Sequence, residues 1–225
     1  MGLEEERAKR REAFLSEEFT AMLPKEIGSY RLHRTDTQND RMYEAYAYED
    51  AETGWRVRIL FDEETMDYMV KTDFRLFVLT DIDLITGDFE EFKKRFPLFF
   101  ERNVRKCLIE RPVSVVVRGR AFTTWNFETA LPPVIGAYRR MIAPDVPIQG
   151  LNGSYIIAMY ENREKGCGIL FFYNYLREFY YAEGFAHGVP IILHDYDAKD
   201  AEILEEIIRS RMESDLRTMS EKEGV

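Results

Sequence analysis

Cysteine and histidine are scarce in this chain of 225 residues, and no two glycines are adjacent. The two cysteines, Cys107 and Cys167, form no CxxC pair, so one disulfide is possible but not implied, and reduced thiols are expected. Because the glycines occur singly, the sequence contains neither a phosphate-binding loop nor a dinucleotide fingerprint. These absences exclude the best-defined nucleotide-binding motifs.

Long apolar runs and an excess of positive charge are absent as well. The longest apolar stretches, such as 115–117 and 169–173, are far shorter than a membrane-spanning helix, and the first residues lack the apolar core of a signal peptide. The net charge of −10 repels phosphate backbones and anionic lipid. We therefore expect a cytoplasmic protein with no nucleic-acid partner, no membrane partner and no cofactor.

Aromatic side chains are abundant, with 16 Phe and 13 Tyr. Hydrophobic residues make up 45% of the chain and charged residues 32%, which is typical of a globular protein rather than a disordered one. Because each aromatic ring buries a large area, half of this chain is enough to build a core without disulfides or metals.

One stretch of sequence occurs twice. Residues 10–31 and 118–139 align without a gap and are identical at ten of 22 positions. The matches include a proline and a glycine at the same places, which shared composition alone does not explain. The matched pairs are Arg10/Arg118, Ala13/Ala121, Phe14/Phe122, Phe19/Phe127, Leu23/Leu131, Pro24/Pro132, Ile27/Ile135, Gly28/Gly136, Tyr30/Tyr138 and Arg31/Arg139.

The repeat predicts the architecture of the whole chain. Further matches follow downstream, among them Tyr68/Tyr180 and Asp83/Asp195. We predict an α+β fold made by tandem duplication of a helix–antiparallel β-meander–helix unit, with repeats at 1–112 and 113–225. An amphipathic sheet with helices on one face is a stable layer arrangement. We expect the two similar halves to be related by a pseudo-twofold axis.

Local patterns place the elements of each half. Apolar spacing and Leu23-Pro24 predict one helix over 3–22, and Asp88 is a suitable N-cap for a helix that Pro97 should kink or divide. The segment 112–121 resembles a strand although its counterpart resembles a helix, so both alternatives stay open. The other predictions are a hairpin of 42–49 and 55–61, one or two strands within 66–84 (clearest at 74–80), a second hairpin of 155–161 and 167–173, and a closing helix over 198–217.

Asp81 and Asp83 form an Asp-x-Asp pair after a predicted strand. Side chains alternate along a strand, so both carboxylates are expected on one side, where they can hold Mg²⁺ and a substrate phosphate. The pair resembles the Asp-x-Asp strand of nucleotidyltransferases of the polymerase-beta type. That family carries a Gly-Ser pair upstream, which 63–72 lacks, and a third carboxylate, which the apolar 113–117 does not supply. The resemblance covers five residues, and the alternative is two solvated carboxylates at a turn.

His194 and Asp195 occupy the corresponding corner of the second half. Imidazole and carboxylate are zinc ligands, and His187 could join His194 across a short loop to make a two-histidine site with Asp195. A hydrogen-bonded or exposed histidine is the ordinary alternative. Only Asp83 of the Asp81/Asp83 pair recurs, because Leu193 stands where the first half has Asp81.

The tyrosines are the strongest signal in the composition. A tyrosine suits a buried sheet face under helices and equally an exposed interaction surface, because its ring is apolar and its hydroxyl is polar. If the surface is exposed, its candidate residues are Tyr46, Tyr48, Tyr160 and Tyr180.

Two hypotheses about function follow. The first is a soluble, non-enzymatic interaction or binding module whose acidic surface engages a protein partner, with homo-oligomerisation left open. The second is a metal-dependent, phosphate-handling enzyme with its site at strand ends near Asp81, Asp83, His194 and Asp195.

Overall fold

The computed structural model describes residues 2–186 and 188–221. The chain forms two compact units; the first ends at Glu110 and the second begins at Arg111. Each unit contains helices and one antiparallel sheet, so the predicted α+β class is confirmed. Within the described ranges, no helix has both the length and the apolar character that crossing a membrane requires.

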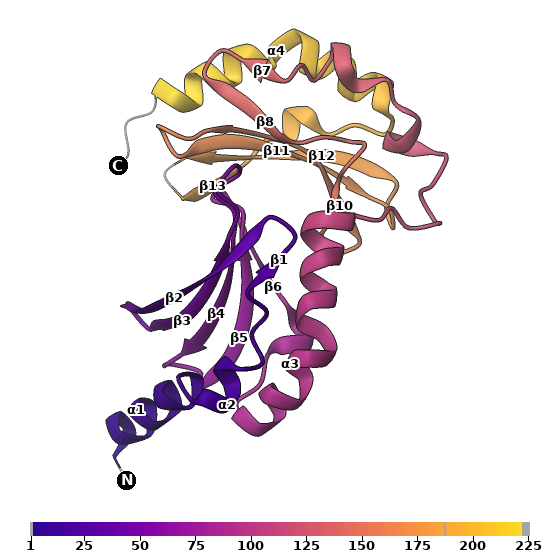
Figure 1. Cartoon of the computed structure of the whole chain (residues 1–225). Helices are drawn as coiled ribbons and strands as arrows, with labels where there is room; N and C mark the ends of the chain where they lie inside the picture. The colour runs from indigo at the N-terminus through magenta and orange to yellow at the C-terminus, as the bar shows by residue number, and fades with distance from the viewer. Residues whose placement is uncertain (1, 187, 222–225) are drawn as a thin grey trace. The chain divides into compact units, whose positions relative to one another are not determined.

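The first unit contains a six-stranded sheet in which every strand pairs with its neighbour in sequence (Figure 1). The predicted hairpin is confirmed as β3 and β4, which pair antiparallel from Met42↔Asp62 to Glu49↔Arg56. The strands are β1 (Glu26–Ile27), β2 (Tyr30–Asn39), β3 (Met42–Glu49), β4 (Arg56–Asp62), β5 (Asp67–Asp73) and β6 (Val78–Thr80).

The prediction of one continuous helix over 3–22 is wrong. The segment is divided into α1 (Leu3–Phe14) and α2 (Glu17–Thr20). Ser16 causes the break, because its hydroxyl donates to the Ala13 carbonyl and accepts from the Phe19 amide, which caps a new helix. Both helices lie near one end of the sheet (Figure 1).

The long helix of the first unit, α3 (Phe89–Val104), begins as predicted. The Asp88 carboxylate accepts from the Glu91 amide at 3.0 Å, so the predicted N-cap is confirmed. The helix continues through Pro97 and then widens into π-helical η2 (Arg105–Glu110). Its buried face is aromatic, with Phe96 at 5.1 Å from Phe19 between ring centroids.

The segment 66–84 holds β5 and β6, but the strand expected at 74–80 is only three residues long. A turn occupies Phe74–Phe77, where the Phe74 amide donates to the Phe77 carbonyl at 2.9 Å. Arg75 adopts a left-handed φ of 75°, and the Asp73 carboxylate accepts from its amide. The side chain of Asp73 thus closes a turn that the apolar content of the segment conceals.

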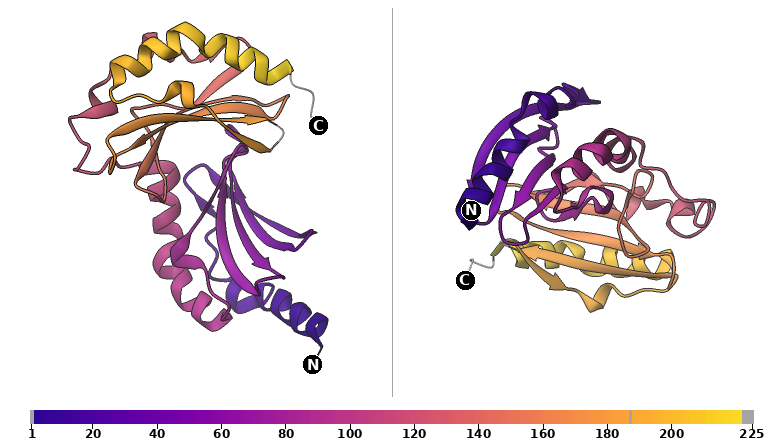
Figure 2. Two further views of the ribbon diagram at one scale, coloured as in Figure 1. Left: turned by 180° about the vertical axis from the view of Figure 1, so that it is seen from behind. Right: turned by 90° about the horizontal axis from the view of Figure 1, so that it is seen from below.

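The second unit contains a seven-stranded antiparallel sheet and one long helix, α4 (Ala201–Glu221), which lies along one face of it (Figures 1 and 2). The predicted hairpin is confirmed as β10 and β11. The outermost strand, β13, contains Pro190 and exposes Val189 and Ile192. The strands are β7 (Val134–Ile135), β8 (Tyr138–Ile142), β9 (Ile148–Gln149), β10 (Ser154–Asn162), β11 (Cys167–Asn174), β12 (Phe179–Ala186) and β13 (Val189–Ile192).

The segment 112–121 is neither a strand nor an α-helix. The amides of Val117 and Arg118 both donate to the Ser114 carbonyl, and Gly119 has a left-handed φ of 74°, so the chain coils through turns. Two short 3₁₀ helices follow, η3 (Ala121–Thr124) and η4 (Phe127–Thr129). The run of valines suggests a strand, but Val115 is 78% exposed and pairs with no strand among the described residues.

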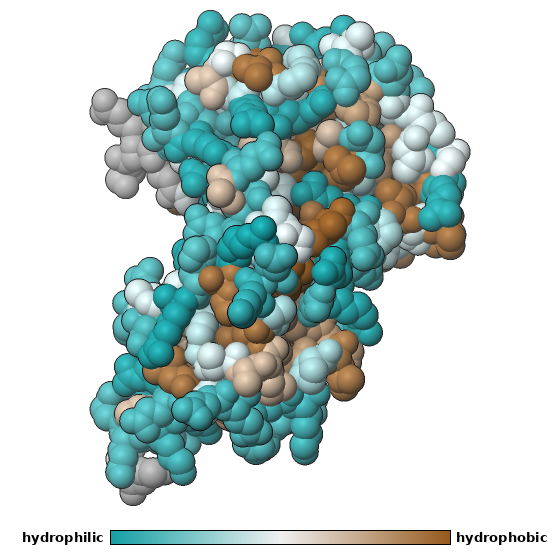
Figure 3. Space-filling model, viewed as in Figure 1, coloured by the Kyte–Doolittle hydropathy of each residue, from teal (hydrophilic) through white to brown (hydrophobic). Residues whose placement is uncertain are grey.

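The surface of the chain is mainly hydrophilic on the face drawn in Figure 3, with scattered apolar side chains. This agrees with a composition in which 32% of residues are charged. Large apolar side chains that do reach solvent include Ile82 and Leu98 in the first unit and Val115, Leu176 and Ile192 in the second.

Candidate functional site

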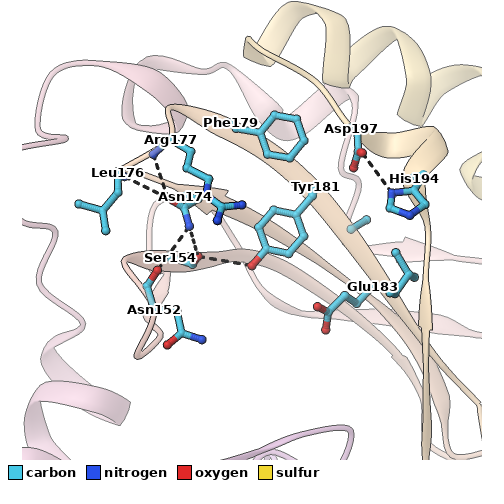
Figure 4. Close-up of a pocket in the computed structure, with 12 residues that line it drawn as sticks. Asn152, Ser154, Asn174, Leu176, Arg177, Phe179, Tyr181, Glu183, His194 and Asp197 are labelled. Atoms are coloured by element: carbon cyan, nitrogen blue, oxygen red, sulfur yellow. Dashed lines mark hydrogen bonds and ion pairs between the residues drawn. The ribbon is translucent and has the colours of Figure 1, made fainter.

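A cavity of the second unit has a volume of about 560 Å³ and opens on the sheet where β11 turns into β12 (Figure 4). On β12, Tyr180 and Ala182 belong to the core that α4 covers, so the alternating Tyr181 and Glu183 point to the other face. We call this cavity the unit-2 pocket; the residues that define it are Ser154, Asn174, Arg177, Tyr181, Glu183 and His194.

Asn174 is the structural centre of the polar side of the pocket. Its carbonyl oxygen accepts from the amides of Leu176 and Arg177, both at 3.0 Å, and so fixes the turn after β11. Its amide nitrogen donates to the Ser154 hydroxyl at 3.2 Å, and that hydroxyl lies 3.4 Å from the Tyr181 hydroxyl. Neighbouring strands and their turn are therefore joined by one side-chain network.

Aromatic rings form the floor. Tyr181 stacks on Phe172 of the neighbouring strand with centroids 4.7 Å apart and ring planes 5° apart. Phe179 lies nearly parallel to Tyr181 at 6.2 Å. Stacked rings on adjacent strands give a rigid apolar surface.

Two oppositely charged side chains of the pocket have no charged partner. Burial raises the pKa of the half-buried Glu183 carboxyl, which makes no hydrogen bond or ion pair with the residues that the structure describes. The Arg177 guanidinium likewise forms no ion pair within the described chain. By contrast, the second acidic side chain of the pocket, Asp197, has a partner: one of its oxygens lies 3.3 Å from His194 Nδ1.

Among residues 2–186 and 188–221, the side chains of the pocket do not make the contact that catalysis by a serine nucleophile requires. A serine nucleophile needs a base within hydrogen-bond reach, and among the described residues Ser154 bonds to Asn174 and Tyr181, whereas His194 bonds to Asp197. The arrangement can recognise a ligand through charge, hydrogen bonds and stacking. It does not present an activated hydroxyl.

The structure brings Asp81 and Asp83 together, although not on a strand. Asp81 follows β6 and caps the 3₁₀ helix η1 (Ile82–Leu84), to which Asp83 belongs. The Asn103 amide nitrogen lies 2.9 Å from Asp81 Oδ2 and 3.0 Å from Asp83 Oδ2. Burial raises the pKa of Asp81. An amide donor thus lies between the carboxylates, in the position that a shared cation would take.

His194 and Asp195 begin the corresponding 3₁₀ helix η5 (His194–Tyr196) and contact different partners. Asp195 Oδ2 lies 2.5 Å from an Arg211 nitrogen, while His194 is directed to Asp197. His187, the suggested second histidine, lies outside the described residues. In the described part of the chain, no three His, Cys, Asp or Glu side chains converge as metal ligands.

The four tyrosines proposed as an interaction surface are buried, which corrects that interpretation. Tyr46, Tyr48, Tyr160 and Tyr180 are at most 3% exposed. Their rings pack under the helices and loops of their own units, as Tyr48 does against Phe100 at 5.3 Å. The apolar ring determines their position, and the hydroxyls of three of them form hydrogen bonds with partly buried groups of their own units.

Sequence reasoning missed Asn174, Arg177 and Glu183, because single polar residues in a turn and on a strand are ordinary. Comparison of the two repeats could have indicated these residues. At a spacing of 112 residues, Glu183 corresponds to Lys71 and Arg177 to Thr65, so the charges differ where the scaffold matches.

The first unit has a smaller groove of about 270 Å³ between 21–24 and the α3 residues Phe96 and Phe100. Its lining is apolar apart from Glu101. It offers shape but little to orient a ligand.

Comparison of the chain with protein-family models, with curated proteins and with solved structures gave no match.

Proposed function

We propose that this chain is a non-enzymatic binding module built by tandem duplication of an α+β unit, with the unit-2 pocket as its ligand site. The proposal includes the pseudo-twofold relation predicted from the sequence, a cytoplasmic location and a protein as the source of the ligand. The observation that carries it is a pocket with a rigid polar network, a stacked aromatic floor and two opposite charges that the described residues leave unpaired.

The internal order of each unit supports the duplication. In both, an antiparallel sheet leads through a short edge strand and a 3₁₀ helix to a long helix. Tyr68 forms an isolated bridge with Thr86, and Tyr180 forms one with Ala198; both partners are 112 residues further along the chain.

A turn that holds the pocket also recurs. The Asp62 carboxylate accepts from the amides of Glu64 and Thr65, as Asn174 accepts from the amides of Leu176 and Arg177. The turn is thus alike in both units, whereas the side chains near it differ, since Met69 corresponds to Tyr181. This difference favours a ligand site that belongs to the second unit.

The alternative function is a metal-dependent, phosphate-handling enzyme. No observation favours it over binding, because Asn103 bridges Asp81 and Asp83, and Arg211 holds Asp195. Thermal melting with Mg²⁺, Mn²⁺, Zn²⁺ and Ca²⁺ separates the two proposals, because saturating metal stabilises a folded chain that binds it. A large rise in Tm that Asp83→Ala abolishes would establish a metal site at Asp83 and favour the enzyme alternative over the binding module.

The binding proposal has its own test. A set of small amines, carboxylates and aromatic amides is added to the isotope-labelled chain, and backbone amide NMR shifts are followed. We expect shift changes to concentrate on 152–154 and 174–183, with no turnover of generic phosphate or ester substrates. Changes spread over both units without a focus, or turnover that survives purification, would contradict the proposal.

A further inference from the structure

The two unpaired charges of the unit-2 pocket come from different places on one edge of the cavity. Arg177 lies in the turn between β11 and β12, and Glu183 lies inside β12. Phe179 and Tyr181 lie between them on the same strand face (Figure 4). The four residue-to-residue steps along β12 from Phe179 to Glu183 span ~13 Å, so the charges flank the aromatic floor rather than neutralise each other.

The Arg177 end of the pocket is a donor end. A guanidinium presents a fork of N–H groups that matches a carboxylate in a bidentate pair. Asn152 also lines this end, and the Asn174 carbonyl oxygen is already used by two backbone amides, so it adds no free acceptor. A ligand group placed here has to accept hydrogen bonds, and a carboxylate does so best.

The Glu183 end is an acceptor end. Burial penalises its carboxylate, and no described donor compensates it. His194 does not do so, because its Nδ1 is directed to Asp197. An ammonium group brought next to Glu183 restores the interactions that desolvation removes.

The middle of the pocket is apolar. Tyr181 is held flat against Phe172, and Phe179 lies beside it. A short aliphatic chain covers such a surface, whereas a compact polar ion does not. The three zones therefore read in order as donor, apolar surface and acceptor.

We propose that the unit-2 pocket binds a bipolar ligand whose carboxylate pairs with Arg177, whose ammonium pairs with Glu183, and whose short aliphatic chain lies on Phe179 and Tyr181. This inference rests on the proposed function and adds the ligand class. The chemistry is the same in a free ω-amino acid and in the C-terminal lysine of a protein. The first unit does not share it, because Thr65 and Lys71 stand at the corresponding positions.

The test is calorimetric titration of the full chain with three probes of equal length: 6-aminohexanoate, hexanoate and hexylamine. We expect 6-aminohexanoate to bind at least about tenfold more tightly than either probe with one charge, because each charged pair adds affinity. Arg177→Gln should reduce 6-aminohexanoate to the affinity of hexylamine, and Glu183→Gln to that of hexanoate. The matched control is Glu178→Gln, whose carboxylate lies in the same turn but pairs with Arg120.

A length series and a peptide series complete the design. Affinity for ω-amino acids from 4-aminobutyrate to 8-aminooctanoate should pass through a maximum, since two fixed charges suit one spacing. A peptide that ends in lysine, compared with its C-terminal amide, then separates the sources. Binding of the acid but not the amide assigns a protein terminus, and binding of free ω-amino acids alone assigns a small molecule.

Two outcomes would overturn the inference. If hexylamine matches 6-aminohexanoate and Arg177→Gln has no effect, the ligand is a simple cation, although the pocket still binds and the proposed function stands. If none of the three probes binds at millimolar concentration while the fragment shifts still map to 174–183, the ligand class is wrong but the site is not. Circular dichroism of each variant establishes that it is folded.

Discussion

The hydroxyl of Tyr48 donates a hydrogen bond to the carbonyl oxygen of Pro24 at 2.8 Å. Tyr160 makes the same bond to Pro132 at 2.6 Å in the second unit. Each bond joins a long strand, β3 in the first unit and β10 in the second, to the Leu-Pro pair that precedes the sheet of that unit. Burial raises the pKa of both hydroxyls, so both remain protonated donors well into the alkaline range.

Loss of either hydroxyl should therefore destabilise the chain. We expect Tyr48→Phe and Tyr160→Phe each to lower the free energy of unfolding by about 1 kcal/mol, because a partly buried carbonyl loses its donor while the ring packing is kept. Urea denaturation measures the change. Tyr175→Phe is the control, since the Tyr175 hydroxyl makes no hydrogen bond with the described residues. Equal stability of all three variants would contradict this account.

The turn at Asn174 predicts a contrast between two substitutions. Asn174→Ala should cost about 1–2 kcal/mol, because the amides of Leu176 and Arg177 lose their acceptor. Asn174→Asp keeps the acceptor, as Asp62 does in the first unit, and should cost much less. Urea denaturation and the amide shifts of 176–177 report both effects. The reverse exchange, Asp62→Asn, should be similarly mild; a severe loss in either exchange would argue against an equivalent turn.

The Glu183 carboxylate should lower the free energy of unfolding at neutral pH. Burial holds its pKa above the unfolded value of 4.5, so the unfolded chain binds fewer protons as the pH rises through the interval between the two values. Stability attributable to this group is therefore complete below that interval and declines across it. We expect Glu183→Gln to raise the free energy of unfolding at pH 7 by less than about 1 kcal/mol, because a half-exposed carboxylate keeps much of its hydration.

The same substitution should have little effect near pH 4, where the wild-type carboxyl is protonated in both states. Paired urea titrations at the two pH values measure the difference. A loss of stability in Glu183→Gln at pH 7 would mean that the carboxylate has a stabilising partner.

Tyr68 predicts the alkaline behaviour of the first unit. Burial raises its pKa from 10.0 to about 12. Between these values the unfolded chain releases a proton that the folded chain retains, so stability falls as the pH rises from 10 to 12. We expect Tyr68→Phe to make this fall shallower, measured by urea denaturation at several pH values together with tyrosinate absorbance. An unchanged pH dependence in Tyr68→Phe would contradict the assignment.

The parts of the fold that the sequence predicted are those decided by nearby residues. Period-two alternation located β3 and β4, and the repeat then located β10 and β11 by their match to that hairpin. The Asp88 cap depends on an amide three residues away. The failures involve side chains that compete with the backbone. Ser16 ends a helix whose pattern continues, and Asp73 closes a turn inside an apolar stretch.

The candidate site was not predicted, for a different reason. Glu183 and Arg177 have no local signature, and only pairing of β12 with β11 places them beside the stacked rings of Phe172 and Tyr181. For the tyrosines, the sequence suggested a surface site that the structure does not contain at those residues. Tyr46 and Tyr48 satisfy their hydroxyls inside the first unit, so a residue type that suits an interface became core.

Pro190 has a consequence for how the protein behaves when it is concentrated. It lies in the edge strand β13, in which Val189 and Ile192 are exposed. An exposed apolar edge strand can pair with a strand of another molecule. Proline carries no amide hydrogen, so a strand of another molecule that pairs with this edge would lack one backbone hydrogen bond. The outer edge of β13 therefore lacks one of the backbone donors that a strand from another molecule would need to extend the sheet.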